Sequence, residues 1–458
     1  MDLSEISKIT SALSGSYHLP GDPTHDVYIL PLSGGADSTA LAIIMQMMFP
    51  EIDFEYVFTD TGAEEPEIYN TLDALEGYLR KPIARVFGGK GLYEMIEEWG
   101  GFLPSAQSRW CTRNLKLTPF REWLKQYAGR QKYMFVGVRA DESSRMAFTI
   151  DEVETEMPYI DLGVRREDVF RILQHSVGIP KYYSRRVRSG CSCCPFQRRS
   201  ERTGLLQTQP VEFRRAMSYE KLADSDASRH AEVLPFSAES GLAANWMTLP
   251  MPKGDSLFGK AGRKDSLSLF AENGIFVGAE VFVDGGLMDD EFVWHQRIVS
   301  YSSSLSGIKR QLQDRYQHLL TTFEVLHFES SDEVRQKARF AVFYVQAPAN
   351  VFDPDGPLAN GTYTWHAGES YRQMAHVVGW ATRILHAEGQ RQLAAQYAGA
   401  RETSWAYEQH EGAAAAIYAV TGETGAVVDS MWFQPKEPAA NDETEFDERL
   451  MACPMCQL

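Results

Sequence analysis

A glycine turn between an apolar segment and a helical segment constrains the fold of this chain most. The run Ser33-Gly34-Gly35-Ala36-Asp37-Ser38-Thr39 follows apolar residues 27–30 and precedes apolar residues 41–45. This order is typical of a strand, a tight turn and a helix. Glycines let a ligand approach the backbone closely, and the amides at a helix N-terminus attract phosphate. Because no lysine follows the glycines, the pattern differs from a Walker A loop and predicts another kind of phosphate-binding turn.

Strand-like and helix-like segments alternate through the first half of the chain. The sequence predicts strands at 27–30, 54–58, 83–87 and 133–138, and helices at 38–49 and 65–79. This alternation predicts an α/β fold, with a mostly parallel, doubly wound sheet and helices on both faces. In such sheets the ligand lies beyond the carboxyl ends of the strands. We therefore expect one crevice to be formed by the turns at 33–39, 59–62 and 137–143.

The length of 458 residues predicts two or three domains. We expect a nucleotide-binding and cysteine-bearing domain over 1–250, a Gly- and Lys-rich linker over 251–265, an α+β accessory domain over 266–434, and a mobile acidic tail over 435–458. In the accessory domain the pattern predicts strands at 275–283 and 338–345 and helices at 289–320 and 371–397. We find no catalytic motif in this second half.

Charge and hydropathy narrow the class of protein. The net charge of −17 argues against a nonspecific nucleic-acid coat protein. No apolar stretch is long enough for a membrane span, and residues 1–10 lack a signal-peptide core, so we expect a cytoplasmic protein. Residues 181–202 nevertheless carry seven cations against Glu201 alone. A local basic surface on an acidic chain suits phosphate recognition, although a solvated helix face is the alternative.

Several segments resemble, in order, the motifs of one superfamily. The run from Ser33 to Thr39 resembles the Ser-Gly-Gly-x-Asp-Ser signature of the PP-loop, or adenine nucleotide alpha hydrolase, superfamily. Four further blocks resemble motifs of its PAPS reductase-like branch. These blocks are Phe58–Gly62 with Glu65–Tyr69, Cys111–Lys116 with Pro119, Gly137–Ser143 with Arg145, and Gly190–Phe196. That branch includes assimilatory sulfonucleotide reductases and the sulfur-transfer ATPases linked to DNA phosphorothioation.

The resemblance implies a site for an adenine nucleotide, either ATP or the sulfonucleotides PAPS and APS. The residues expected to bind it are Ser33, Gly34, Gly35, Asp37, Ser38, Thr39, Thr59, Asp60, Thr61, Gly137 and Arg139. Lys116, Arg139 and Arg145 would neutralise phosphate or sulfate oxygens. Asp37 and Asp60 would hold Mg²⁺ or ribose. We assign catalytic roles to Asp37, Lys116, Arg139 and Arg145.

The cysteines are clustered, which favours a metal or redox role over a disulfide framework. Of six, four are Cys111, Cys191, Cys193 and Cys194, and two, Cys453 and Cys456, end the acidic tail as a Cys-x-x-Cys pair. By resemblance, the first four are expected to bind a 4Fe-4S cluster. The tandem pair lies in the second block, whereas family reductases have it in the first, so zinc and uncoordinated thiols are alternatives.

The leading function is ATP pyrophosphatase or adenylyl-transfer chemistry in sulfur incorporation. The α-phosphate is attacked, pyrophosphate leaves, and the loop amides stabilise its charge. Expected partners are a sulfur donor such as a cysteine desulfurase or thioredoxin, a nucleic-acid acceptor facing Arg185, Arg186 and Arg188, and further copies or proteins in a complex. One alternative is a PAPS or APS reductase, although its C-terminal Glu-Cys-Gly-Leu-His-like motif is missing. Another is a non-catalytic nucleotide-sensing subunit.

Overall fold

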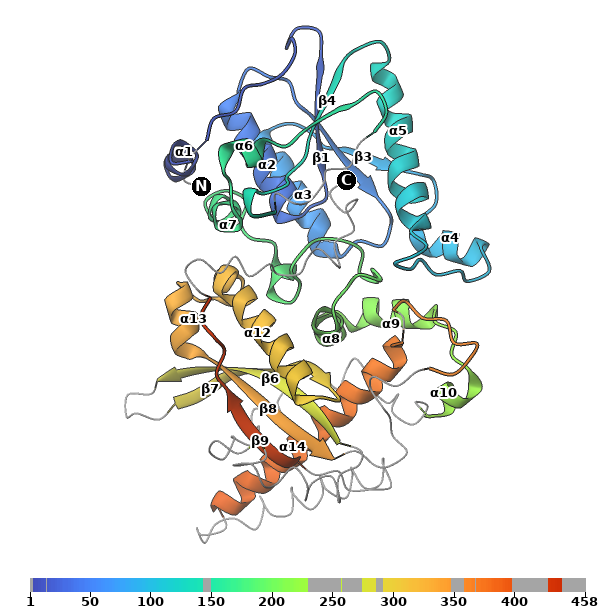
Figure 1. Ribbon diagram of the computed structural model, residues 1–458, viewed down its shortest axis with the longest axis vertical. Helices are drawn as coiled ribbons and strands as arrows, with labels where there is room; N and C mark the ends of the chain where they lie inside the picture. The colour runs from blue at the N-terminus through green and yellow to red at the C-terminus, as the bar shows by residue number, and fades with distance from the viewer. Residues whose placement is uncertain are drawn as a thin grey trace. The chain divides into compact units, whose positions relative to one another are not determined.

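The computed structural model describes residues 3–13, 15–142, 150–229, 257, 274–285, 291–346, 358–366, 368–397 and 427–438. It divides into two compact units (Figure 1). Among the described residues, unit 1 is drawn from 1–197, 319–330 and Pro438, and unit 2 from 198–318 and 331–437. The sequence places the end of the first domain at 250, whereas the structure groups residues 198–229 with unit 2. Almost all of the predicted linker and tail lies outside the described residues.

Unit 1 contains a five-stranded sheet in the order β3-β2-β1-β4-β5. Its strands are β1 (Val27–Leu32), β2 (Glu55–Asp60), β3 (Ala84–Phe87), β4 (Lys132–Phe135) and β5 (Glu154–Glu156). Every neighbouring pair is parallel. The predicted α/β fold is therefore confirmed, and β1, β2 and β4, which precede the three predicted ligand turns, lie side by side.

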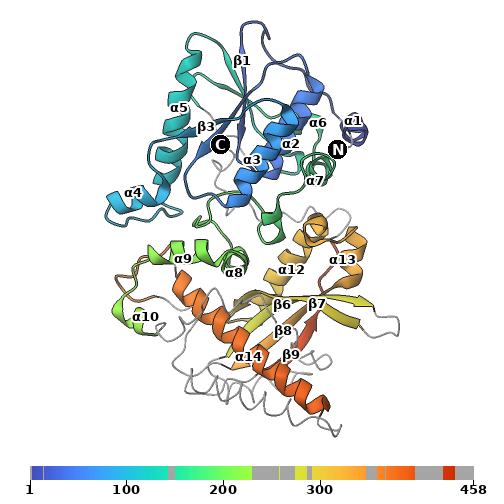
Figure 2. The ribbon, with the colours of Figure 1, turned by 180° about the vertical axis from the view of Figure 1, so that it is seen from behind.

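Helices cover both faces of this sheet. They are α1 (Leu3–Ser11), α2 (Ala36–Met48), α3 (Pro66–Leu79), α4 (Leu92–Glu98), α5 (Thr118–Leu124), α6 (Pro158–Leu162) and α7 (Arg166–Gln174). Figures 1 and 2 show α2 and α3 together on one face and α5 on the other. Alternate residues of β1 point to opposite faces, so Tyr28 and Leu30 pack in the α2 core whereas Val27 and Ile29 pack against α5. Burial on both faces explains the apolar strands that the sequence displays.

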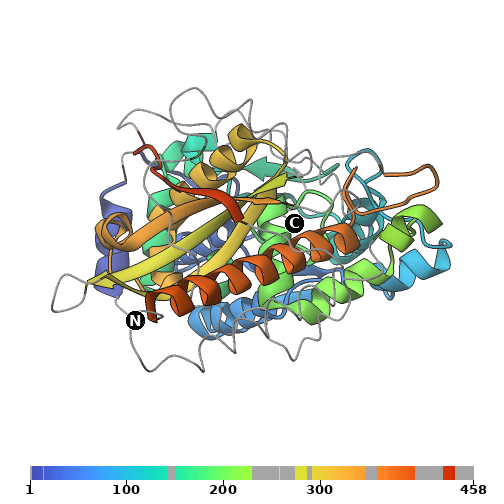
Figure 3. The ribbon, with the colours of Figure 1, turned by 90° about the horizontal axis from the view of Figure 1, so that it is seen from below.

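Unit 2 has its own antiparallel sheet in the order β7-β6-β8-β9. Its strands are β6 (Gly274–Gly285), β7 (Glu291–Ser302), β8 (Ala338–Gln346) and β9 (Val427–Phe433). Its helices are α8 (Arg199–Thr208), α9 (Pro210–Ser218), α10 (Asp224–Arg229), α12 (Leu305–Thr321), α13 (Ser331–Lys337) and α14 (Tyr371–Tyr397). Figure 3 shows α14 running along this sheet, where it contacts β7 and β9.

The second-half predictions were confirmed except in one segment. The strands near 275–283 and 338–345 and the helix over 371–397 are present. The helix predicted over 289–320 was wrong in its first part, because residues 291–302 form β7 and pair along their length with β6. This segment is rich in aromatic and β-branched residues that fit a pleated surface. The helix starts only after Ser304, whose hydroxyl accepts the Gly307 amide at 3.1 Å. No helix in the described part of the chain is both long and apolar enough to cross a bilayer.

Candidate functional site

The glycine turn joins β1 to α2, and side-chain hydroxyls hold its backbone amides. The amide of Ser33 donates to Ser38 Oγ at 3.2 Å, and that of Gly35 donates to Ser33 Oγ at 3.3 Å. The amide of Ala36 donates to the Tyr183 hydroxyl at 2.9 Å. Gly34 has φ +65°, a left-handed conformation that favours glycine. Three amides in the turn and at the start of α2 thus donate to hydroxyl oxygens. Phosphate oxygens are acceptors of the same kind, and they could take the places of these hydroxyls.

Residues far away in the sequence clamp this turn. The Tyr182 hydroxyl donates to Gly34 O at 2.8 Å, and the Ser189 hydroxyl donates to Ser33 Oγ at 3.2 Å. The turn is tightly enclosed, since a Cβ on Gly35 would lie 2.6 Å from Ser189 Oγ. Sequence reasoning missed Tyr182, Tyr183 and Ser189. The one sequence feature that marks them is their position within the basic run at 181–202, and this position carries no information about hydrogen-bond partners.

The turn after β4 abuts the glycine turn. The strand order reverses between β1 and β4, which makes their carboxyl ends the switch point where ligands bind in such sheets. A Cβ on Gly137 would lie 3.1 Å from the backbone of Asp37, so glycine permits this approach. From the same turn, Arg139 Nη1 pairs with Asp37 Oδ1 at 2.9 Å. The structure therefore brings Gly137, Arg139 and Asp37 together, whereas Ser143 and Arg145 lie outside the described residues.

The turn after β2 carries a network of carboxylates and hydroxyls. Asp60 Oδ1 accepts the Gly62 amide at 2.7 Å and the Tyr69 hydroxyl at 2.8 Å. The Thr61 hydroxyl donates to the carboxylate of buried Glu64 at 2.8 Å. The buried hydroxyls of Thr39 and Thr59, two predicted ligand contacts, have no hydrogen-bond partner among the described residues. An unsatisfied buried hydroxyl is costly, which favours a ligand near these side chains.

The cysteine segment is docked on that turn. Cys191 forms an isolated antiparallel bridge with Glu64, and the Ser192 amide donates to Ala63 O at 2.9 Å. Cys191 Sγ lies 3.3 Å from Thr61 Oγ1 and 3.8 Å from Glu64 Oε1. The first cysteine of the Cys-x-x-Cys pair therefore lies beside the predicted nucleotide turn.

Burial controls the protonation of this region. Burial raises the pKa of Glu64, and nearby Lys116 opposes that rise. Burial also raises the pKa of the Cys191 thiol, and the Glu64 charge adds to this rise. Lys116 is itself buried, in a π-helix over Thr112–Leu117. Such helices are rare and frequent at functional sites. Glu64, which sequence reasoning missed, links Lys116 to Cys191.

Cys111 and Cys193 interact electrostatically with each other. Cys111 immediately precedes the π-helix, and Cys193 is fully buried. Burial raises the pKa of Cys193 to about 12, and the Cys111 thiol adds to the rise. The donor chemistry of four thiols fits iron or zinc. In the described part of the chain, however, no three His, Cys, Asp or Glu side chains are arranged to hold a metal ion. Cys453 and Cys456 lie outside the described residues.

Two arginines of the basic run do not belong to the exposed acceptor surface that the sequence predicted. Arg185 and Arg186 are buried and both pair with the Glu65 carboxylate. Burial opposes ionisation of Glu65, but Arg186 and Arg185 outweigh it and lower its pKa. In unit 2, Arg199 and Arg202 pair with buried Glu369, each at 2.8 Å. The expectation that Arg185 and Arg186 face an acceptor was therefore wrong, since both are buried and pair with Glu65, which is distant in the sequence.

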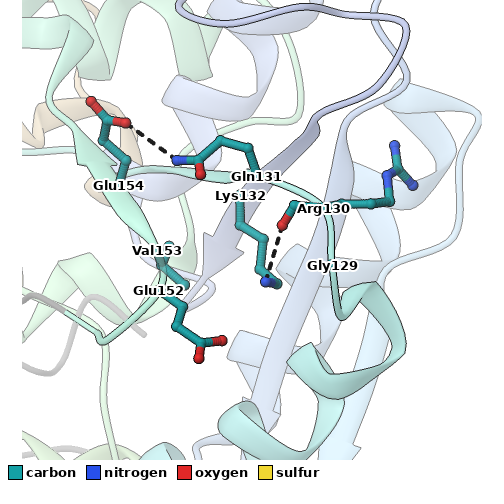
Figure 4. A pocket seen from close by; sticks show the side chains of 7 residues that line it. All are labelled: Gly129, Arg130, Gln131, Lys132, Glu152, Val153 and Glu154. Atoms are coloured by element: carbon teal, nitrogen blue, oxygen red, sulfur yellow. Dashed lines mark hydrogen bonds between the residues drawn. The ribbon is translucent and has the colours of Figure 1, made fainter.

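A cavity of about 650 Å³ lies elsewhere in unit 1 (Figure 4). Its lining comes from residues 129–132 and 152–154, at the amino ends of β4 and β5. There Gln131 donates to Glu154 at 3.3 Å and the Lys132 ammonium donates to Arg130 O at 3.2 Å. Because the glycine turn lies at the carboxyl ends of the strands, this cavity is not part of the candidate site.

Part of unit 1 is similar to a known protein family. Residues 27–178 match the phosphoadenosine phosphosulfate reductase domain. Two uncharacterized proteins of Methanocaldococcus jannaschii are 26% and 29% identical over 192 and 193 residues, and each match covers 40% of this chain. An uncharacterized nin region protein of Escherichia phage lambda is 28% identical over 153 residues, covering 26% of this chain and 50% of that protein. The match spans only 39% and 44% of the length of the two archaeal relatives.

One solved structure is also similar. The crystal structure of phosphoadenylyl-sulfate reductase from Candida auris, in a phosphate complex, is 11% identical in sequence, with a TM-score of 0.28. The similarity covers 38% of this chain and 86% of that chain.

Proposed function

We propose that unit 1 binds an adenine nucleotide and acts on its phosphates, because residues 27–178 match the phosphoadenosine phosphosulfate reductase domain. One observation carries this proposal. The amides of Ser33, Gly35 and Ala36 donate to side-chain hydroxyls at the switch point of the sheet. Phosphate oxygens are hydrogen-bond acceptors as these hydroxyls are, and amides at a helix N-terminus attract phosphate.

The leading reaction cleaves ATP, so that the AMP part is transferred to an acceptor and pyrophosphate is released. An acceptor oxygen attacks the α-phosphorus, the bond to the bridging oxygen breaks, and pyrophosphate leaves with the electron pair. The turn from Ser33 to Thr39 would stabilise the leaving charge through its amides. Lys116 and Arg139 would supply the nearby positive charge, and Asp37 and Asp60 are the hard oxygen donors that would hold Mg²⁺. When bound, Mg²⁺ would neutralise charge on the phosphates.

We expect purified full-length protein to convert ATP to AMP and pyrophosphate, and Ser38→Ala to lower the rate about 100-fold. Ser38 Oγ accepts the Ser33 amide at 3.2 Å, so its loss removes both a ligand contact and the support of the turn. The matched control is Ser7→Ala in α1, whose side chain is exposed. Pyrophosphate release measured for the three proteins tests this. Equal rates for wild type and Ser38→Ala would overturn the assignment.

The family match favours sulfonucleotide reduction as a second function. It would release sulfite from PAPS or APS and needs a thiol reductant such as thioredoxin. The same preparation assayed with these nucleotides and thioredoxin separates the two functions. Sulfite without AMP formation from ATP would establish reduction and refute the leading proposal.

The second proposal concerns Cys111, Cys191, Cys193 and Cys194, which would together hold a 4Fe-4S cluster, with zinc as the alternative. We expect anaerobically purified protein to contain iron and sulfide and to absorb broadly in the visible range. Cys191→Ala should lose this iron, whereas the Cys453→Ser/Cys456→Ser control should retain it. Elemental analysis under anaerobic conditions measures both. Stoichiometric zinc with no iron would show that the site is not an iron–sulfur centre.

A sulfur-donor protein, a nucleic-acid acceptor, assembly with other chains and a cytoplasmic location remain predictions of the sequence. The acceptor prediction has lost its first support, since Arg185 and Arg186 are buried against Glu65.

A further inference from the structure

Three carboxylates surround the guanidinium of Arg139, each on a different nitrogen. Nε donates to Asp141 Oδ1 at 3.1 Å, Nη2 to Glu142 Oε1 at 2.7 Å, and Nη1 to Asp37 Oδ1 at 2.9 Å. The Arg139 side chain is only 5% exposed. This arginine is therefore held in one orientation.

The three carboxylates differ in origin. Asp141 and Glu142 belong to the same 3-10 turn, Ala140–Glu142, and follow Arg139 directly in the chain. Asp37 instead belongs to α2, which starts at the glycine turn. The Nη1 contact with Asp37 thus crosses from the β4 turn to the glycine turn, whereas the other two contacts are local. The two local contacts, with Asp141 and Glu142, fix the direction of the guanidinium. The contact with Asp37 occupies Nη1, the nitrogen that faces the glycine turn.

We propose that Asp141 and Glu142 are positioning residues that aim Arg139 Nη1 at the nucleotide, and that a phosphate oxygen replaces the Asp37 carboxylate there. This inference rests on the proposed nucleotide binding at Ser33–Thr39. Asp37 is the carboxylate that yields, because its side chain is 33% exposed, against 26% for Asp141 and 12% for Glu142.

The backbone of Asp37 stays fixed during this exchange. Its carbonyl oxygen accepts the Tyr159 hydroxyl at 2.9 Å, and Gly137 packs against the same backbone. Only the short carboxylate arm has to turn toward water. Binding would then release the Asp37 carboxylate from Arg139 and leave its oxygens available for the Mg²⁺ role proposed above.

The test is binding of inorganic pyrophosphate without divalent cations, measured by calorimetry. Asp37→Asn removes the competing carboxylate and should tighten binding about fivefold. Asp141→Asn/Glu142→Gln should weaken it about tenfold, since a misdirected guanidinium loses a charged hydrogen bond. This second direction is diagnostic, because removing two negative charges would by itself tighten the binding of an anion. The matched control is Asp73→Asn, which loses the exposed ion pair with Arg85 and should change nothing.

An Arg139→Met background provides the second readout. In this background the Asp141→Asn/Glu142→Gln pair should no longer weaken pyrophosphate binding. If Asp141 and Glu142 only stabilised the fold, the two substitutions would weaken binding even without the arginine. If the double variant does not fold, Glu142→Gln alone carries the test. Tighter binding by the double variant, or weaker binding by Asp37→Asn, would overturn the inference while leaving the proposed function intact. Absence of both pyrophosphate and nucleotide binding in wild type would overturn both.

Discussion

Replacing Gly34 by alanine is expected to lower nucleotide affinity at least 100-fold, since two independent effects oppose the added Cβ. Gly34 has φ +65°, and an L-residue in this region costs about 1–2 kcal/mol. The new Cβ would also lie 2.6 Å from Ile68 Cγ2 of α3, so either the turn or α3 must shift. A shift would break the hydrogen bond from Tyr182 to Gly34 O, 2.8 Å in the native turn, and move the amides proposed to hold phosphate.

Gly77→Ala is the matched control for this prediction. Gly77 lies inside α3, and a Cβ there meets nothing within 4 Å. Because alanine is a better helix former by about 0.8–1.0 kcal/mol, the control should bind nucleotide normally and melt slightly higher. Titration with ATP and thermal melting of both variants give the comparison. Similar affinities for Gly34→Ala and Gly77→Ala would show that the glycine turn does not bind the nucleotide.

Glu65→Gln is expected to cost unit 1 about 3–5 kcal/mol of unfolding free energy, because it leaves two buried guanidinium groups without their shared carboxylate. Both Arg185 and Arg186 pair with Glu65, whose side chain is fully buried. Breaking one side of a buried ion pair is far more costly than losing an exposed one. Urea unfolding followed by near-UV circular dichroism measures the loss.

The exposed pair of Arg85 with Asp73 is the control, and Asp73→Asn should cost at most about 1 kcal/mol. The Glu65 contribution also has a defined pH dependence. The pKa of Glu65 is lowered below its usual 4.5, so its stabilisation is present above that value and is lost as the pH falls through the lowered pKa. Equal losses for Glu65→Gln and Asp73→Asn at neutral pH would contradict the buried triad.

The sequence allowed the parallel sheet and its glycine turn to be predicted because both depend on local order. A strand, two glycines and a helix follow one another within about twenty residues, and the apolar runs of β1 and β2 identify buried parallel strands. The same logic placed three turns at one edge of the sheet, and the adjacency of β2, β1 and β4 agrees with it.

What could not be predicted depends on partners far away in the chain. Arg185 meets Glu65 across 120 residues, and Ala36 meets Tyr183 across 147. No local pattern distinguishes an arginine that faces phosphate from one that a distant carboxylate buries. The helix predicted over Glu291–Ser302 was wrong for a related reason, since this segment forms a strand by pairing with β6. Side-chain burial decided each of these outcomes, and burial is a property of the whole fold.

Unit 1 is built from stretches that lie far apart in the chain, which bears on the order in which the protein can mature on the ribosome. Residues 319–330 belong to unit 1 although about 120 residues of unit 2 precede them. Within them, the 3-10 turn Phe323–Leu326 contacts the turn Lys181–Ser184, and Val325 packs against the α2 core. The turn Lys181–Ser184 carries the two tyrosines that clamp the glycine turn. A nascent chain released at residue 197 or 250 would lack this support, so the glycine turn would reach its final packing only after synthesis has passed residue 330.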